Sequence, residues 1–299
     1  MIEQFKGTNL IEFMDRFSNE EKCKEYLLEL KWGAGFKCDK CNHLHYWKKK
    51  GNPYARVCKS CRHINSVTAN TLFHKVKFGL RKAFLILFEM STTTKGCSSP
   101  VIARKYGINQ KSAWLFMSKV RKAMSSSRNY PLDGRCEVDE ILIGGHKSGK
   151  PGRGALGKKK ACIVVEKSNK GGVKRAYGLK VANFSTLELT KLFEKHIDSK
   201  AKVETDLWRS YQPLKESWDI SQSKSEPQKN FQTIHRFIQQ LKSWMRGIFH
   251  KVTDGYLQGY LDEFCFRLNR HLNKDTIFHT LTERMIKHQP VPKSKLILQ

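Results

Sequence analysis

Four cysteines have the residue type and spacing of a metal-thiolate site. They form two Cys-x-x-Cys pairs, Cys38 with Cys41 and Cys58 with Cys61, and 16 residues separate the pairs. At this spacing two knuckles can deliver four thiolates tetrahedrally to one zinc ion. The surrounding polar segment has too little apolar surface to fold without a metal. We therefore predict a zinc ribbon with a structural zinc ion.

Two aspartates lie where an ionised carboxylate needs a partner. Asp139 stands inside the apolar stretch 136–143, and Asp206 directly follows the stretch 203–205. Burying a charge is costly unless it is paired or bound to a metal. Carboxylates suit hard divalent cations, and a pair of such ions can activate a hydroxyl and stabilise the leaving oxygen of a phosphodiester. A third ligand is expected from a helix, and after Pro227 the residues His235, Gln239, Lys242 and Arg246 share a polar stripe.

The charge balance indicates a polyanionic partner. Lys and Arg number 56 against 27 Asp and Glu, which gives a net charge of +29 over 299 residues. A purely small-molecule enzyme has no reason to carry this excess. The sequence lacks an apolar run long enough to span a membrane, and residues 1–10 do not follow a signal-peptide pattern. We expect a cytosolic protein without a membrane partner or a small-molecule substrate.

A pair of helices separated by a glycine turn could bind DNA. The spacing predicts helices over 98–106 and 110–124 around Gly107, which is the pattern of a helix-turn-helix motif. The second helix would lie in a major groove and present these residues to it: Gln110, Lys111, Ser112, Lys119, Arg121 and Lys122.

A glycine-rich basic stretch follows the strand that carries Asp139. It includes Lys147, Lys150 and Arg153, and its glycines exclude a stable helix. One interpretation is a solvated hairpin loop. The position of the stretch next to Asp139 favours contact with the DNA backbone.

The order of elements predicts a mixed α/β domain behind smaller modules. Strands are expected over 136–143, 161–166, 176–181 and 203–205, and helices over 186–197, 234–248 and 255–269. The expected organisation is a helical lead-in (1–33), a zinc ribbon (34–74), a helical DNA-binding domain (75–130), a catalytic domain (131–287) and a loose tail (288–299).

The order of these motifs resembles the ISXO-like insertion-sequence transposases, which are related to the Merlin superfamily. The similarity rests on the cysteine quartet, the helix pair, Val138-Asp139-Glu140 with Gly144-Gly145, Thr205-Asp206 with Tyr211, Leu241-Lys242, and Tyr260-Leu261-Asp262-Glu263-Phe264 with Arg267 and Asn269. It spans roughly residues 10–272.

The resemblance implies a ribonuclease H-like catalytic domain, with a mixed sheet flanked by helices, behind the zinc ribbon and the helix-turn-helix. Asp139 and Asp206 match the first two catalytic acids, and Lys242 matches the lysine after the third. The family commonly has Glu or Asn seven residues before this lysine, where the chain has His235; Gln232 and Glu263 are alternative third ligands. Imidazole binds divalent ions, and RuvC-like resolvases resemble this arrangement, so we expect two Mg²⁺ or Mn²⁺ ions with a greater tolerance for Mn²⁺.

The implied function is a transposase that binds the terminal inverted repeats, cleaves the ends by metal-dependent hydrolysis and joins the 3′-hydroxyls to target DNA. Its partners would be double-stranded DNA and a second copy in a homodimer or larger synaptic assembly at the bacterial nucleoid. One alternative is a catalytically inactive DNA-binding regulator, which the departure at His235 keeps open. A junction-resolving nuclease fits less well, because two DNA-reading modules precede the active site.

Overall fold

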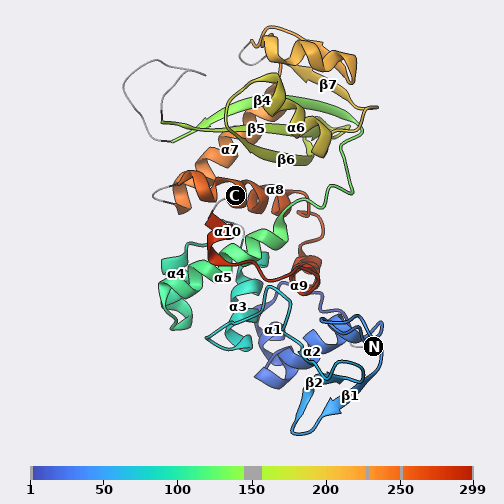
Figure 1. Ribbon diagram of the computed structural model, residues 1–299. Helices are drawn as coiled ribbons and strands as arrows, with labels where there is room; N and C mark the ends of the chain where they lie inside the picture. The colour runs from blue at the N-terminus through green and yellow to red at the C-terminus, as the bar shows by residue number, and fades with distance from the viewer. Residues whose placement is uncertain (1–2, 94, 145–156, 227–228, 250–251, 298–299) are drawn as a thin grey trace. The chain divides into compact units, whose positions relative to one another are not determined.

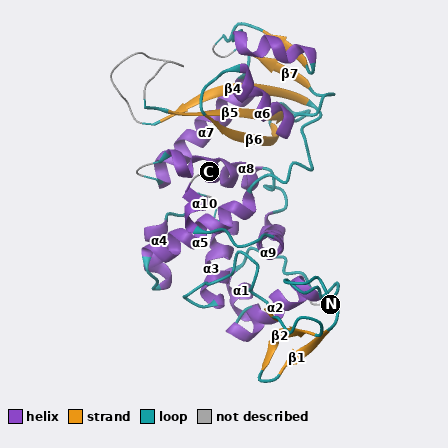
Figure 2. Ribbon diagram, in the orientation of Figure 1, coloured by secondary structure: helices purple, strands orange, loops and turns teal. Residues whose placement is uncertain are grey.

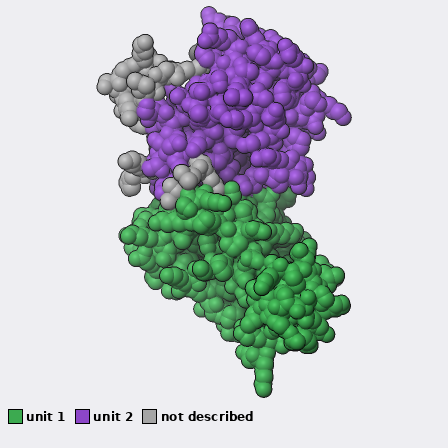
Figure 3. Space-filling model, in the orientation of Figure 1, with its two compact units in different colours: residues 1–123, 272–296 green, residues 124–271, 297–299 purple. Residues whose placement is uncertain are grey.

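The computed structural model describes residues 3–93, 95–144, 157–226, 229–249 and 252–297. Contacts divide the chain into two compact units, which Figure 3 shows in different colours. The first contains residues 1–123 and 272–296, and the second contains residues 124–271 and 297–299. Residues 272–287, which the sequence analysis groups with the catalytic domain, belong to the first unit. Among the described helices, none is long and apolar enough to cross a bilayer.

Aromatic rings from distant parts of the sequence build the core of the first unit. Phe13 in α1 (Leu10–Arg16) stacks on Phe88 in α3 (Leu80–Thr92) with ring centroids 4.2 Å apart. Phe278 in α9 (Ile277–Lys287) meets Phe13 edge-on at 4.9 Å. Such pairs add to the energy of burial. The unit also contains α2 (Glu20–Trp32), the short η3 (Lys274–Thr276) and all but the last residue of α10 (Lys293–Ile297). Helix α10 lies within the predicted tail and buries Leu296.

A small antiparallel sheet holds the cysteine quartet. Its strands are β1 (Tyr46–Lys49), β2 (Asn52–Cys58) and β3 (Ile64–Ser66), paired in the order β1-β2-β3. Figure 2 labels the first two of them. Asn42 and Arg62 each follow the second cysteine of a pair, and both have a positive φ, near 60°. The N–H of Asn42 bonds to the carbonyl of Cys38, and the N–H of Arg62 bonds to the carbonyl of Cys58. The two knuckles therefore fold in the same way.

The predicted helix pair forms as α4 (Ser99–Tyr106) and α5 (Gln110–Met124). Gly107 ends α4 in the left-handed region with φ 58°, a conformation that glycine adopts without strain. Asn109 then accepts a hydrogen bond from the N–H of Lys111 at 2.9 Å and caps α5.

The second unit is built on a five-stranded mixed sheet, which can be followed in Figure 1. Its strands are β4 (Arg135–Ile143), β5 (Lys159–Lys167), β6 (Val173–Val181), β7 (Lys202–Thr205) and β8 (Asp219–Gln222). The spatial order is β6-β5-β4-β7-β8; β4, β5 and β6 run antiparallel, while β7 and β8 continue parallel to β4. The predicted α/β class is confirmed.

Helices cover both faces of this sheet. One face packs on α6 (Thr186–His196) and the 3-10 segment η2 (Arg209–Glu216) through Val138, Val164 and Phe193. The other packs on α7 (Gln232–Ile248) and α8 (Asp254–Leu268) through Ile141, Ile163 and Phe237. Because side chains alternate along a strand, Asp139 shares the α7 face with Ile141.

Two amides cover the outer edge of β6. Asn269 accepts a hydrogen bond from the N–H of Ala176 at 2.8 Å and donates one to its carbonyl at 3.0 Å. Gln258 bonds in the same way to the N–H of Lys180 and the carbonyl of Gly178. These side chains satisfy backbone groups that an edge strand otherwise leaves open.

Candidate active site and zinc centre

The register of the sheet brings the two predicted aspartates to the same level. Parallel pairing of β4 with β7 aligns Glu137 with Glu204. Continuing this register by two residues aligns Asp139 with Asp206, just beyond the end of β7. Neighbouring strands lie about 4.8 Å apart, so this register brings the two aspartates to one level of the sheet.

Backbone N–H groups orient both carboxylates. Oδ1 of Asp139 accepts a hydrogen bond from the N–H of Glu140 at 2.8 Å. Oδ1 of Asp206 accepts one from the N–H of Trp208 at 3.0 Å. The side chain of Asp139 is 27% exposed, so solvent reaches the acid in spite of its position in the sheet.

His235 approaches Asp139 from the first turn of α7. Its Nε2 lies 3.8 Å from Oδ2 of Asp139. The first turn of α7 packs on the sheet through the buried side chains of Ile234, one residue before His235, and Phe237, two residues after it. The imidazole is 41% exposed and therefore does not point into packed hydrocarbon.

Lys242 lies further along α7 and is half-buried. Burial lowers the pKa of its ammonium group. The charge of Asp139 opposes this shift, while the charges of Lys158 and Arg246 add to it. Lys242 is therefore electrostatically coupled to the first aspartate.

The two alternative third ligands lie in different surroundings. Gln232 is exposed at the first position of α7. Glu263 is 1% exposed in α8, and its Oε1 lies 3.6 Å from Nη1 of Arg267. Its burial and its ion pair favour a structural role over metal binding.

The donor set of Asp139, Asp206 and His235 fits divalent cations, since it offers two carboxylates and one imidazole with an accessible acid. Among the described residues, the cysteine quartet is the group of three or more His, Cys, Asp or Glu side chains that could hold a single metal ion, and these three residues do not form such a group. Ligands that flank two ions roughly 3.5–4 Å apart are more widely spaced than ligands of a single ion.

A buried charge network lies next to the aspartates, and the sequence analysis did not identify it. Glu137 is 3% exposed and pairs with Lys167 at 3.3 Å, and Lys167 also pairs with Glu204 at 2.8 Å. Burial lowers the pKa of Lys167, but the two glutamates raise it more, and the net shift is upward. The signal was the spacing of two residues between Glu137 and Asp139, which puts both on one face of a strand.

The cysteine quartet has the geometry of a tetrahedral zinc site. The four Sγ atoms lie within 4.8 Å of one another; the distance is 3.7 Å between Cys38 and Cys61 and 3.5 Å between Cys41 and Cys58. A tetrahedron with Zn–S bonds of about 2.3 Å has S···S edges of about 3.8 Å. The thiolates therefore fit one zinc ion, as predicted.

Hydrogen-bond donors around Cys38 favour its thiolate. Burial raises the pKa of this thiol, but N–H groups of Lys40, Cys41 and Asn65 lower it more, to about 6. The buried Asn65 carboxamide donates to Sγ of Cys38 and accepts a hydrogen bond from the N–H of Asp39 at 2.8 Å. Such second-layer bonds orient a metal ligand.

The predicted DNA-contacting residues of α5 fall into two groups. Gln110 and Lys111 are exposed, and Ser112 and Lys122 are half-buried. Lys119 and Arg121 are only 8% and 6% exposed, and the ammonium of Lys119 donates to the carbonyl of His74 at 2.8 Å. These two side chains lie inside the first unit, so the structure argues against a groove contact for them. The predicted Lys147, Lys150 and Arg153 lie outside the described residues.

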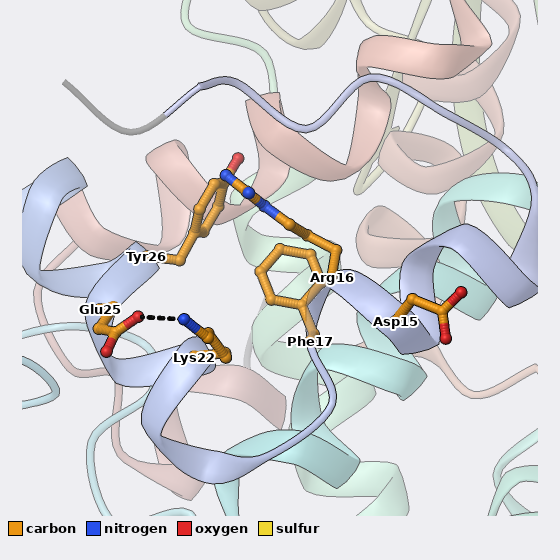
Figure 4. A pocket seen from close by; sticks show the side chains of 6 residues that line it. All are labelled: Asp15, Arg16, Phe17, Lys22, Glu25 and Tyr26. Atoms are coloured by element: carbon orange, nitrogen blue, oxygen red, sulfur yellow. Dashed lines mark ion pairs between the residues drawn. The ribbon is translucent and has the colours of Figure 1, made fainter.

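A pocket in the first unit is unrelated to these sites. It has a volume of about 490 Å³ and is lined by residues of α1, the following turn and α2, which Figure 4 shows: Asp15, Arg16, Phe17, Lys22, Glu25 and Tyr26. Lys22 and Glu25 pair across 3.3 Å. Its charges are mixed, and the predicted site residues do not line it.

The strand order, the acids on two neighbouring parallel strands and the covering helices define a ribonuclease H-like catalytic fold. Residues 131–269 match the family model of the ISXO2-like transposase domain, and residues 18–64 match the transposase zinc-ribbon domain. The chain therefore contains an ISXO2-like transposase domain and, before it, a transposase zinc-ribbon domain.

Solved structures give more distant similarities. A simian T-cell lymphotropic virus intasome in complex with PP2A regulatory subunit B56 gamma shares 12% identity, with 72% of this chain and 76% of that chain covered and a TM-score of 0.34. The Mos1 strand transfer complex shares 11%, with coverage of 68% and 78% and a TM-score of 0.27. A pre-cleavage Mos1 transpososome shares 10%, with coverage of 64% and 75% and a TM-score of 0.24. A comparison with curated proteins finds no match.

Proposed function

We propose that this transposase binds the terminal inverted repeats of an insertion sequence, cleaves them by hydrolysis and joins their 3′-hydroxyls to target DNA. The observation that carries the proposal is the meeting of His235 with Asp139, at 3.8 Å, on the sheet face where Asp206 is level with Asp139. Asp139, Asp206 and His235 would hold two Mg²⁺ or Mn²⁺ ions. When bound, these ions supply activation of the attacking oxygen and stabilisation of the leaving oxygen.

In the first reaction, water attacks the scissile phosphorus, the bond to the 3′-oxygen breaks, and that oxygen leaves as a 3′-hydroxyl. In the second, this hydroxyl attacks a phosphorus of target DNA and displaces another 3′-hydroxyl. Lys242 would hold a phosphate beside Asp139, to which it is already electrostatically coupled. Neither reaction requires a covalent protein intermediate.

DNA binding would use the zinc ribbon and the exposed face of the helix pair. Gln110 and Lys111 are accessible at the start of α5, and Ser112 and Lys122 are partly so. The net charge of +29 supports binding along a phosphate backbone. Lys147, Lys150 and Arg153 would contact the backbone next to the active site. Bringing two element ends together requires a homodimer or a larger assembly, at the nucleoid in the cytoplasm.

The test is cleavage of a duplex that contains an element end, with purified full-length chain in Mg²⁺ or Mn²⁺. We expect nicking and joining by the wild-type chain, and loss of both in Asp139→Asn. The matched control is Asp219→Asn, an exposed aspartate of β8, which should retain activity.

The replacement of the family's common Glu or Asn by His235 favours one second candidate, a regulator that binds DNA without cleaving it. Tight binding of the element end with no nicking in either metal ion would establish the regulator and reject the enzyme.

A further inference from the structure

The helix that carries His235 begins without a side-chain cap of its own. The residue before α7 is Phe231, which has a φ of 54° and offers no hydrogen-bond acceptor in its side chain. The first N–H groups of a helix have no partner within the helix and need one from elsewhere. Oε2 of Glu137, on β4, accepts a hydrogen bond from the buried N–H of Ile234 at 2.8 Å. A strand carboxylate thus takes the place of an N-cap residue.

Each oxygen of the Glu137 carboxylate faces a group that favours its negative charge. Oε2 faces the start of α7, where the helix dipole favours an anion. Oε1 lies 3.3 Å from Nζ of Lys167, whose other partner is Glu204 on β7. The network therefore links three neighbouring strands to the first turn of α7.

We propose that Glu137 is a positioning residue that fixes the His235 imidazole beside Asp139. The inference rests on the proposed function, because the distance between His235 and Asp139 matters for activity only if both side chains bind the catalytic metal ions. Glu137 precedes Asp139 by two residues on the same face of β4, and it bonds to the residue immediately before His235. One carboxylate therefore sets the separation of two metal-binding groups that come from different elements.

The physical reason is the precision that metal ligands need. Removing a residue that hydrogen-bonds to a metal ligand and orients it typically lowers metal affinity by about 10- to 100-fold. Without its bond to Glu137, the first turn of α7 has an unsatisfied buried N–H and frays most easily at its end. His235 lies in this turn, so without the bond its imidazole would lose its fixed distance to the carboxylate of Asp139.

The test compares Glu137→Ala with Glu166→Ala. Glu166 is an equally buried glutamate of the same sheet, paired with Arg175 at 2.9 Å and Lys174 at 3.0 Å, and it serves as the matched control. We expect Glu137→Ala to raise the Mn²⁺ concentration for half-maximal end cleavage by about 10- to 100-fold. Glu166→Ala should lower the melting temperature and leave the Mn²⁺ dependence unchanged.

Rescue by a conservative variant separates positioning from folding. The amide oxygen in Glu137→Gln can still accept the N–H of Ile234, so its Mn²⁺ dependence should stay within about threefold of wild type. If Glu137→Ala does not fold, Glu137→Asp tests the same contact, since its carboxylate is one methylene short. A folded Glu137→Ala or Glu137→Asp protein with the wild-type Mn²⁺ dependence would overturn the proposal.

A readout without catalysis distinguishes this proposal from the proposed function. Mn²⁺ should broaden the imidazole NMR signal of His235, which is assigned by its absence in His235→Asn, and a higher Mn²⁺ concentration should be needed in Glu137→Ala. If the wild-type chain shows broadening but no cleavage, the proposed enzyme fails and the positioning role stands. If broadening is identical in the two proteins, the positioning role fails whatever the cleavage assay shows.

Discussion

In the proposed metal site, His235 would supply a nitrogen ligand at the position where the resemblance to ISXO-like transposases implies an oxygen ligand from Glu or Asn. Mg²⁺ prefers oxygen ligands, while Mn²⁺ accepts imidazole more readily. Nε2 of His235 lies 3.8 Å from Oδ2 of Asp139, so the imidazole is close enough to the acid to influence which ion the proposed site binds.

We therefore predict that His235→Glu raises cleavage in Mg²⁺ relative to cleavage in Mn²⁺ by roughly an order of magnitude. The measurement is the ratio of initial cleavage rates in the two ions. Gln232→Glu, which adds the same side chain at the exposed start of α7, is the control and should leave the ratio unchanged. An unchanged ratio in His235→Glu would show that His235 does not bind the ion.

The lowered pKa of Lys242 predicts a pH dependence. Burial disfavours the charged ammonium, so Lys242 loses its proton at a lower pH than an exposed lysine. If the charge holds a phosphate, cleavage should fall on the alkaline side as Lys242 becomes neutral. Lys242→Arg stays charged and should move this alkaline midpoint to higher pH, as measured in pH-rate profiles.

The control for Lys242 is Lys180→Arg, which changes another partly buried lysine of the same unit that pairs with Asp254. Its profile should match that of wild type. Equal alkaline midpoints in Lys242→Arg and wild type would mean that the charge of Lys242 does not limit cleavage.

Residue-level predictions succeeded where chemistry is local in sequence. The Cys38, Cys41, Cys58 and Cys61 quartet follows from spacing alone, and its Sγ atoms do gather. The burial of Lys119 could not be predicted, because the carbonyl that it meets belongs to His74, 45 residues away in an irregular segment. Glu137 was visible as an acid two residues from Asp139, but its partner in α7 is 97 residues away.

At the scale of elements, the zinc ribbon depends on its metal. Strands β1 and β3 have only four and three residues, the residues of β1 are all exposed, and β2 buries Ala55, Arg56 and Cys58, so little apolar burial stabilises the sheet. Zinc binding in small domains contributes about 10–16 kcal/mol at neutral pH, which is coupled to folding.

Cys58→Ser should reduce the zinc content well below one ion per chain and unfold the segment 46–66. Metal analysis and amide hydrogen exchange measure the two effects. The strands β4 to β6 should keep their protection, since they have a core of their own. Cys97→Ser, which changes a buried cysteine outside the quartet, should retain the zinc; a folded ribbon in zinc-free Cys58→Ser would contradict the prediction.

The elements themselves were largely predictable, since both helices of the pair, the strand that carries Asp139 and the strand that ends just before Asp206 form where the sequence pattern places them. Register was not predictable. The alignment of Glu137 with Glu204, which makes the two aspartates level, depends on long-range parallel pairing. Local pattern cannot specify such pairing.

At the scale of the whole molecule, the net charge of +29 should make the affinity for DNA fall steeply as the salt concentration rises. Each lysine that neutralises a phosphate contributes about 0.9 to the slope of log K against log salt concentration. Lys111→Gln should therefore reduce the slope by about 0.9, as measured by fluorescence anisotropy with an end-containing duplex.

Lys119→Met, which changes a buried lysine of the same helix, provides the comparison. It should alter stability and leave the slope unchanged. If both variants reduce the slope equally, the exposed face of α5 is not the phosphate contact.

The path of the chain between units was also beyond prediction. The sequence analysis did not single out α9, and the local pattern of its residues does not identify what its apolar face packs on. Phe278 completes the aromatic core built by Phe13 and Phe88, which precede it in the sequence by 265 and 190 residues.

The amides of Gln258 and Asn269 have a consequence for self-association. A protein that gathers copies of itself on DNA reaches high local concentration, where unpaired strands tend to join into continuous sheets. Because these amides occupy the backbone groups of Ala176, Gly178 and Lys180, another polypeptide cannot add to β6 there without displacing them. Any assembly of copies on DNA would therefore have to form without strand addition at this part of β6.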